Sequence, residues 1–365
     1  MMERATSRPA RMTGIWWRTA SARRVVIVLL AVLLLAAAVV SVGIGAAGIP
    51  VSRLPAALGL AGNHADPAIA ARDTLVLWSI RLPRIVIALL IGGLLAVSGA
   101  IMQGLFCNPL ADPALVGVSS GGALAAAAAI VAGDRLMAAS GVTLPFGLLT
   151  VAAFIGSLVT TLILYRISTR EGQTSVAIFL LGGLAIGAIA NAGLGLLIFI
   201  ADDRQLRDIT FWMLGSLSGA TWSKAAVMTP FLAALLIALP FISRGLDLLV
   251  LGESDAFHSG IAVERLKRIC IVLVSAMVGA AVSFAGVIGF VGIVVPHLLR
   301  LVIGPSHAML LIASTLLGAA LLLVADTAAR TIAAPAEVPI GILTALIGSP
   351  FFLFLLLRQR GLVGL

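Results

Sequence analysis

Long apolar runs dominate this 365-residue chain and decide where it can fold. A helix needs about 20 apolar residues to cross the hydrocarbon core of a bilayer. Runs of about that length lie at residues 25–48, 85–107, 114–133, 142–165, 176–200, 225–243, 308–325 and 338–357. Soluble domains carry about 25% charged residues, whereas only 11% of this chain is charged. The pattern predicts an all-α polytopic membrane protein and excludes a soluble enzyme, a disordered chain and a disulfide-stapled secreted domain.

One further run, at 269–303, is too long for a single span. As one helix its 35 residues would reach roughly 50 Å, well beyond the thickness of the hydrocarbon core. Gly286, Gly289 and Gly292 lie near its middle, so we predict two helices separated near Ala285–Gly289. The total is then ten transmembrane helices, and an even number places both termini on the same side.

The ten spans divide the chain into a membrane domain and two tails. The first apolar run is longer than the apolar core of a signal peptide, so we expect a retained first helix behind a basic tail. We predict an N-terminal tail at 1–24, the membrane domain at 25–357 with a loop at about 244–268, and a C-terminal tail at 358–365.

The basic residues orient these spans. Fifteen lysines and arginines fall on the side of the two tails and nine on the other side, so the tails are predicted to be cytoplasmic. A net charge of +9 would suggest nucleic acid in a soluble protein, but aromatic residues total only 5% and offer no stacking platform. We interpret the charge as basic loops beside anionic membrane lipid, with no nucleic-acid partner.

Arginines at the start of the second span are candidate contacts for a partner. Arg81 and Arg84 lie three residues apart within Ile80–Arg84. They could anchor the helix to lipid headgroups. They could equally form a socket for a partner's carboxylates, because guanidinium pairs with carboxylate through two hydrogen bonds.

Two other segments are candidates for contact with a substrate or a partner. The charged cluster Asp203–Asp208, followed by the glycine-punctuated stretch 211–219, suits either a pore mouth or a solvated loop. Residues Leu251–Ile261, in the longest cytoplasmic loop, predict short amphipathic helices between glycines. Such helices can dock into a groove on a partner, or lie on the surface without one.

The chain carries no pattern typical of an enzyme or a metal protein. Its only lysines, Lys224 and Lys267, do not complete a P-loop, so we expect no ATP hydrolysis and no catalytic residues. Its four histidines fall in different loops, so no metal site is expected. An ion-coupled secondary transporter remains the alternative, but such proteins place ionisable residues near mid-membrane, and these spans are nearly free of charge there.

Six ordered motifs resemble the permeases of ABC importers for iron–siderophores, heme and vitamin B12. They are Arg-Leu-Pro-Arg at 81–84, Asn-Pro-Leu-Ala-Asp-Pro at 108–113, Trp-Met-x-Gly at 212–215, Leu-Gly-Glu at 251–253, Pro-His-x-x-Arg at 296–300 and Glu-x-Pro-Ile-Gly at 337–341. Each motif is weak alone, but the ordered set covers almost the whole chain. The overall likeness is to the hemin permeases of Gram-negative bacteria, while ferric-siderophore and cobalamin permeases share the architecture.

The resemblance implies a ten-helix type II importer permease in the bacterial inner membrane. It implies a homodimer with the translocation path along its axis, two cytoplasmic ATPase subunits that bind ATP and Mg, and a periplasmic substrate-binding protein. This chain itself would bind no cofactor, and heme would be the transported substrate.

The matched motifs also imply roles for individual residues. Docking of the binding protein is implied for Arg81, Arg84 and Arg330, the last of which matches the arginine of the family's Ala-Asp-x-x-Ala-Arg segment, here at 325–330. The translocation path is implied to include Arg207 at its outer mouth, with Thr174 and Ser175 near its narrowing at the start of span five. Coupling to the ATPase is implied for Leu251, Gly252, Glu253, Ser254, Asp255, Ala256, Phe257, His258, Ser259 and Gly260.

Overall fold

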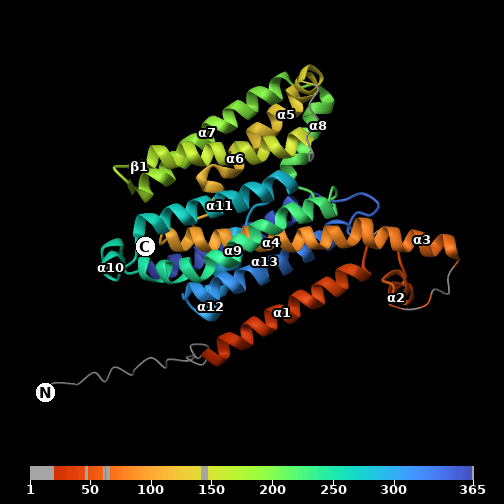
Figure 1. The fold of residues 1–365 in the computed structure, drawn as a ribbon, viewed down its shortest axis with the longest axis horizontal. Helices are drawn as coiled ribbons and strands as arrows, with labels where there is room; N and C mark the ends of the chain where they lie inside the picture. Colours follow the sequence, from red (N-terminus) through yellow and green to blue (C-terminus); the bar gives the residue numbers. More distant parts are fainter. Residues whose placement is uncertain (1–19, 46–47, 61, 63–65, 141–146, 364–365) are drawn as a thin grey trace.

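The protein is an elongated bundle of helices that lie side by side (Figure 1). A computed structural model describes residues 20–45, 48–60, 62, 66–140 and 147–363. The long helices are α1 (Ala20–Gly43), α4 (Leu82–Leu105), α5 (Val118–Ser140), α6 (Gly147–Ser168), α7 (Val176–Ile200), α9 (Trp222–Leu249), α11 (Val263–Ala285), α12 (Val291–Ile303), α13 (His307–Ala329) and α14 (Ile340–Val363).

Short elements occupy the two ends of the bundle. One end carries α2 (Leu54–Ala57), α3 (Pro67–Leu75) and α8 (Asp203–Leu214), and we name it the α8 end. The other end, named the α10 end, carries α10 (Glu253–His258) and a hairpin of β1 (Thr169–Arg170) and β2 (Gln173–Thr174). A π-helical turn, Val76–Arg81, joins α3 to α4, and 3₁₀ turns lie at Val51–Arg53 and Pro113–Val116.

The number and length of the helices confirm a polytopic membrane protein. Seven helices of the described chain are long and apolar enough to cross a membrane, and they lie at Ser21–Gly43, Pro67–Leu105, Gly147–Ser168, Val176–Ile200, Trp222–Leu249, Val263–Ala285 and His307–Ala329. Shorter apolar helices at Val118–Gly133, Val291–Ile303 and Ile340–Phe354 coincide with the other three predicted runs. The count of ten spans stays a prediction.

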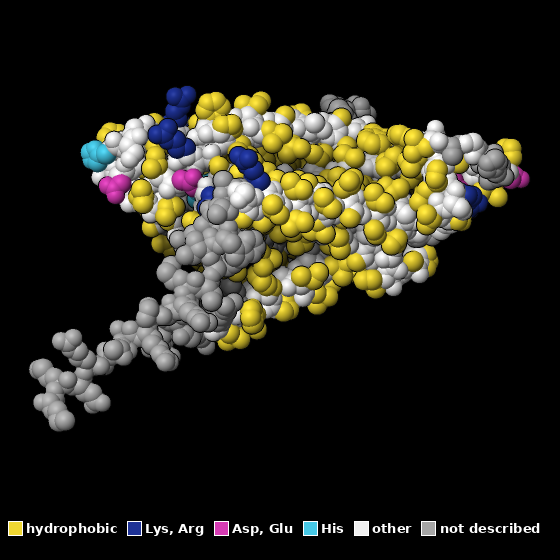
Figure 2. Space-filling model, turned by 90° about the horizontal axis from the view of Figure 1, so that it is seen from below, with side chains coloured by type: hydrophobic (Ala, Val, Ile, Leu, Met, Phe, Trp, Pro, Cys, Tyr) yellow, Lys and Arg dark blue, Asp and Glu magenta, His cyan; other side chains and the backbone are white. Residues whose placement is uncertain are grey.

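The surface is apolar along the bundle and charged toward its ends. Figure 2 shows yellow side chains over most of the visible face, with charged side chains gathered toward the two ends. Phe199 is 86% exposed, Phe241 75% and Leu181 68%. Apolar exposure on this scale would be unfavourable in water, and it suits helices surrounded by lipid.

Helix α4 lies in the centre of the bundle because glycines let its neighbours approach closely. It packs against α9, α11, α12 and α13. A Cβ atom at Gly92 would overlap the backbone of Gly318 on α13, and one at Gly99 would overlap the backbone of Gly292 on α12. Small residues at helix contacts are the usual means of tight packing in membranes.

The predicted break in the 269–303 run is confirmed. Helix α11 ends at Ala285 and α12 begins at Val291, with Gly286 and Phe290 in the left-handed region at φ of +73° and +68°. The amide of Ser216 donates to the carbonyl of Ala285 at 2.9 Å. The interrupted backbone thus finds a hydrogen-bond partner within the protein, which a broken helix needs inside a membrane.

Several helices extend beyond the apolar runs that predicted them. Helix α9 continues past Arg244 to Leu249, and α11 begins at Val263, so the segment between them is Val250–Ala262. Polar residues interrupted the hydropathy pattern without ending these helices. The predicted N-terminal tail lies mostly outside the described residues, since 1–19 are not among them.

Candidate functional site

Three arginines predicted to contact a partner lie together at the α8 end. Arg81 precedes α4, Arg84 lies in its first turn and Arg330 follows the last residue of α13. We name them the arginine cluster. Their exposed fractions are 3%, 7% and 7%, so the rest of the chain encloses them almost completely.

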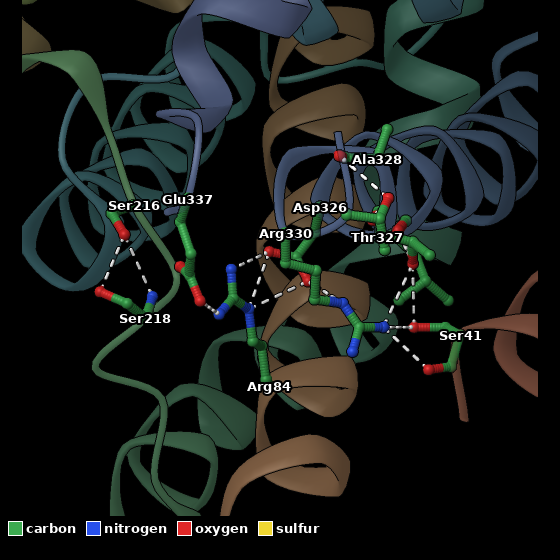
Figure 3. A network of polar contacts seen from close by, with 11 residues as sticks. Ser41, Arg84, Ser216, Ser218, Asp326, Thr327, Ala328, Arg330 and Glu337 are labelled. Atoms are coloured by element: carbon green, nitrogen blue, oxygen red, sulfur yellow. Dashed lines mark hydrogen bonds and ion pairs between the residues drawn. The ribbon is translucent and has the colours of Figure 1, made fainter. Parts of the chain in front are cut away.

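Arg84 forms the most extensive ion pairs of the cluster. Its Nη2 donates to Oδ1 of Asp326 at 2.8 Å, and its Nε donates to Oδ1 and Oδ2 of Asp326 at 2.9 and 3.1 Å. Its Nη1 donates to Oε1 of Glu337 at 2.7 Å. Figure 3 shows the guanidinium between the two acids. The Asp326 side chain is 1% exposed and that of Glu337 is 39% exposed. The geometry is the bidentate one that makes arginine–carboxylate pairs strong.

The other two arginines hold the last turn of α1. Nη2 of Arg330 donates to the carbonyl and the hydroxyl of Ser41 at 2.8 and 2.6 Å, and Nη1 of Arg81 donates to the carbonyl of Val42. The last carbonyls of a helix have no partner within the helix and carry partial negative charge. These two cations therefore fix α1 to the bundle.

The arginine cluster keeps an excess of positive charge after its internal pairing. Counting Asp73, which acts on Arg81, and Arg53, which pairs with Asp73 at 3.2 Å, four guanidiniums face three carboxylates, those of Asp73, Asp326 and Glu337. An acidic partner would be attracted to this end, but its carboxylates would compete with Ser41, Asp326 and Glu337 for the same donors. The docking role of Arg81, Arg84 and Arg330 stays a prediction.

Arg207 lies on α8 at the same end of the bundle and is exposed. Helix α8 begins with a capping box, in which Asp202 accepts from the amide of Gln205 at 2.8 Å and Gln205 accepts from that of Asp202 at 3.2 Å. Ile209 is 1% exposed and anchors the helix to the bundle. The charged cluster is therefore a helix at the end of the bundle, and the place of Arg207 in a translocation path stays a prediction.

The predicted coupling segment, residues 251–260, lies at the opposite end. It forms the six-residue helix α10 between Gly252 at φ +115° and Gly260 at φ +87°, backbone conformations that favour glycine. Ala256 is fully buried, whereas Leu251 and Phe257 are 65% and 67% exposed. One short helix thus forms where short helices were predicted, and the exposed apolar side chains are Phe257 on it and Leu251 before it.

Thr174 and Ser175 enter α7 beside that helix. The hairpin before them pairs Thr169 with Thr174, and its turn holds Glu171 and Gly172 at φ of +53° and +80°. The Ser175 hydroxyl caps α7 by accepting from the amide of Ile178 at 3.4 Å. The expected position at the start of span five is confirmed, while a gating role stays a prediction.

A buried lysine joins these two parts of the α10 end. Nζ of Lys267 donates to the carbonyl of Thr174 at 3.0 Å, to Glu253 at 2.7 Å and to Glu264 at 2.9 Å. The Lys267 side chain is 3% exposed. Together these residues border a cavity of about 1110 Å³ between the hairpin and α10.

Comparisons with known proteins assign the chain to a family. The FecCD transport family matches residues 24–358. The chain belongs to this family. The hemin transport system permease protein HmuU of Yersinia pestis is 46% identical over 293 residues, which are 78% of this chain and 84% of that protein. The cobalamin import system permease protein BtuC of Halobacterium salinarum is 43% identical over 288 residues, 78% of this chain and 74% of that protein.

A solved structure described as an inward-facing metal-chelate type ABC transporter agrees with this FecCD assignment. It superposes with a TM-score of 0.78 at 33% identity and covers 92% of this chain and 99% of that one. The FecCD protein is thus a membrane permease component of an ABC importer. Such a permease works with a separate ATPase subunit, which hydrolyses ATP, and with a substrate-binding protein.

Sequence reasoning missed the internal partners of the charged residues in this FecCD protein. Asp326 and Glu337 were recognised as parts of motifs but not as partners of Arg84, from which they are 242 and 253 residues distant. Lys267 was considered only as a residue that completes no P-loop. A usable signal was present, because Glu264 and Lys267 lie three residues apart, as ion pairs on a helix do.

Proposed function

We propose that the chain is the permease subunit of an importer that carries heme from the periplasm to the cytoplasm. The observation that carries the proposal is the 46% identity to a hemin permease over most of both chains. The 43% identity to a cobalamin permease makes cobalamin the second candidate, and ferric siderophores are a third within the same architecture. In each case the chain would bind no cofactor of its own, and ATP and Mg would bind to the ATPase.

We place the α10 end in the cytoplasm of a bacterial inner membrane and the α8 end in the periplasm. The basic residues favour this orientation, because the start of α1, the end of α14 and most of the arginines predicted to be cytoplasmic lie at the α10 end. The complex would contain two copies of this chain and two ATPase subunits. The exposed apolar helix faces that lie outside the interface between the two copies would contact lipid.

Docking of the two soluble partners follows from this orientation. The exposed Phe257 of α10 and Leu251 just before it would enter a groove on the ATPase. The excess positive charge of the arginine cluster would attract acidic residues of the binding protein. The translocation path would run from Arg207 to Thr174 and Ser175, with ATP binding in the partner changing which end is open.

The test is uptake by the reconstituted importer. The permease, its neighbouring ATPase and binding protein would be assembled in proteoliposomes, and ATP-dependent uptake of hemin, cyanocobalamin and a ferric siderophore would be measured separately. We expect hemin uptake that requires ATP and the binding protein, with vesicles lacking ATP as the control. Uptake of cobalamin or siderophore without hemin uptake would refute heme as the substrate.

A further inference from the structure

Lys267 is a buried cation whose three donors are all used. An ammonium group has three N–H donors and no acceptor, and here they reach Thr174, Glu253 and Glu264. The three acceptors belong to different elements, namely the hairpin, α10 and α11. The Lys267 side chain therefore connects the hairpin, α10 and α11 at the border of the cavity.

Glu264 reinforces the tie to the hairpin. Its Oε2 accepts from the amide of Thr174 at 2.9 Å, while its Oε1 pairs with Lys267. The peptide groups on both sides of Thr174 are thus held by side chains of α11. Thr174 is followed directly by Ser175, the N-cap of α7. The side chains of Glu264 and Lys267 therefore hold the backbone that leads into the first turn of α7.

The contact of Lys267 with Glu253 of α10 is more accessible to solvent than its contact with Glu264. The side chain of Glu253 is 54% exposed, that of Glu264 31% and that of Lys267 only 3%. Glu253 is also the first residue of α10. A movement of α10 by a partner would move Glu253, and Lys267 would either follow it or lose a charged partner in a buried position, which is unfavourable.

We propose that Lys267 is a positioning residue that transmits movement of α10 to the hairpin and the start of α7. The inference rests on the proposed function, in which α10 contacts the ATPase and Thr174 and Ser175 border the path. Lysine suits this role because its flexible stem and rotatable ammonium can keep three acceptors while the segments move together.

The test uses the complete importer with permease, ATPase and binding protein in lipid nanodiscs. Cys107 and Cys270 are replaced, and spin labels are placed at the exposed positions Gln173 and Ser254, with labelled protomers diluted in unlabelled ones. For the unaltered lysine we expect one narrow Gln173–Ser254 distance distribution that ATP does not change, because hairpin and α10 move together. For Lys267→Met we expect a distribution that broadens or shifts when ATP is added.

A transport measurement distinguishes transmission from simple support of the fold. In proteoliposomes, Lys267→Met should retain stimulated ATP hydrolysis while the ATP consumed per hemin taken up rises by about tenfold or more, as loss of allosteric coupling predicts. Lys267→Arg should restore part of the coupling. The matched control is Lys224→Met, since Lys224 lies at the α8 end and its ammonium donates to the Gly219 carbonyl at 2.7 Å and to no other group of the described chain. This variant should change neither readout.

Two results would overturn the inference. One is a Lys267→Met importer with an unchanged distance response and an unchanged ratio of ATP to hemin. The second applies if that variant fails to assemble. Glu253→Ala removes only the half-exposed contact of Lys267, and an unchanged distance response in Glu253→Ala would also overturn the inference. Failure of the proposed function is separate: if the wild type takes up no hemin while ATP still changes the Gln173–Ser254 distance in Lys267→Met, heme alone is refuted and the inference stands.

Discussion

The pairing of Arg84 with Asp326 predicts a large loss of stability when the arginine is removed. The Asp326 side chain is 1% exposed, and in Arg84→Met its carboxylate loses three hydrogen bonds. Within the described chain it keeps the ion pair with Nε of Arg330 at 3.7 Å. Breaking a buried pair from one side costs about 3–5 kcal/mol, whereas the half-exposed pair with Glu337 contributes about 0–1 kcal/mol. We expect a loss near the lower limit, about 3 kcal/mol, because Arg330 remains nearby.

The assay is equilibrium unfolding in mixed micelles with an increasing fraction of SDS. Intrinsic fluorescence reports the transition, since the chain has five tryptophans. A loss of about 3 kcal/mol corresponds to roughly a 150-fold change in the unfolding equilibrium constant. Glu337→Gln is the control and should cost less than about 1 kcal/mol.

A double variant tests whether the two groups interact. Arg84→Met combined with Asp326→Asn should destabilise by less than the sum of the single changes, with a coupling of about 1–3 kcal/mol. Additive effects, or a loss below about 1 kcal/mol for Arg84→Met, would refute the reasoning. The arginine would then be held chiefly for contact with a partner and not for the fold.

Three further predictions use other parts of the chain. Gly99→Val should destabilise the protein by about 1–3 kcal/mol or prevent insertion, because its side chain overlaps the Gly292 backbone; wild-type yield and unfolding would contradict this. The Cys107 thiol is exposed, but partial desolvation by the surrounding protein raises its pKa and the charge of Glu253 raises it further. Maleimide should therefore react with it more slowly at neutral pH than with a free cysteine, faster as pH rises, and faster in Glu253→Gln; buried Cys270 should not react. The permease alone should release no phosphate from ATP, and turnover that survives repurification would refute a separate ATPase.

Hydropathy predicted the helices well where a span is uniformly apolar. The run at 176–200 has the same bounds as α7, and the break near Ala285–Gly289 falls between α11 and α12. The prediction was poorer where charged residues continue a helix, as Arg244 does in α9. Charge ends an apolar run, but it does not end a helix whose backbone hydrogen bonds continue.

The partners of the charged residues could not be predicted in the same way. Arg81 and Arg84 are predicted from the sequence as candidate contacts for a partner, yet Arg84 pairs with an acid 242 residues away within the chain. Likewise, Lys267 reaches Thr174 only because α11 packs beside the hairpin. Such pairs depend on tertiary packing, which neither periodicity nor local spacing encodes.

The glycine contacts of α4 determine which parts of the protein can move during transport. A helix that touches α12 through Gly99 and α13 through Gly92 cannot rotate, since a rotation would bring side chains into the backbone of its neighbours. These three helices form a tightly packed frame, so we expect the movements of transport in the helices around it. Substitutions at the two glycines should therefore destabilise the protein or prevent its insertion, whereas those at the entry to α7 should leave an assembled importer with impaired transport.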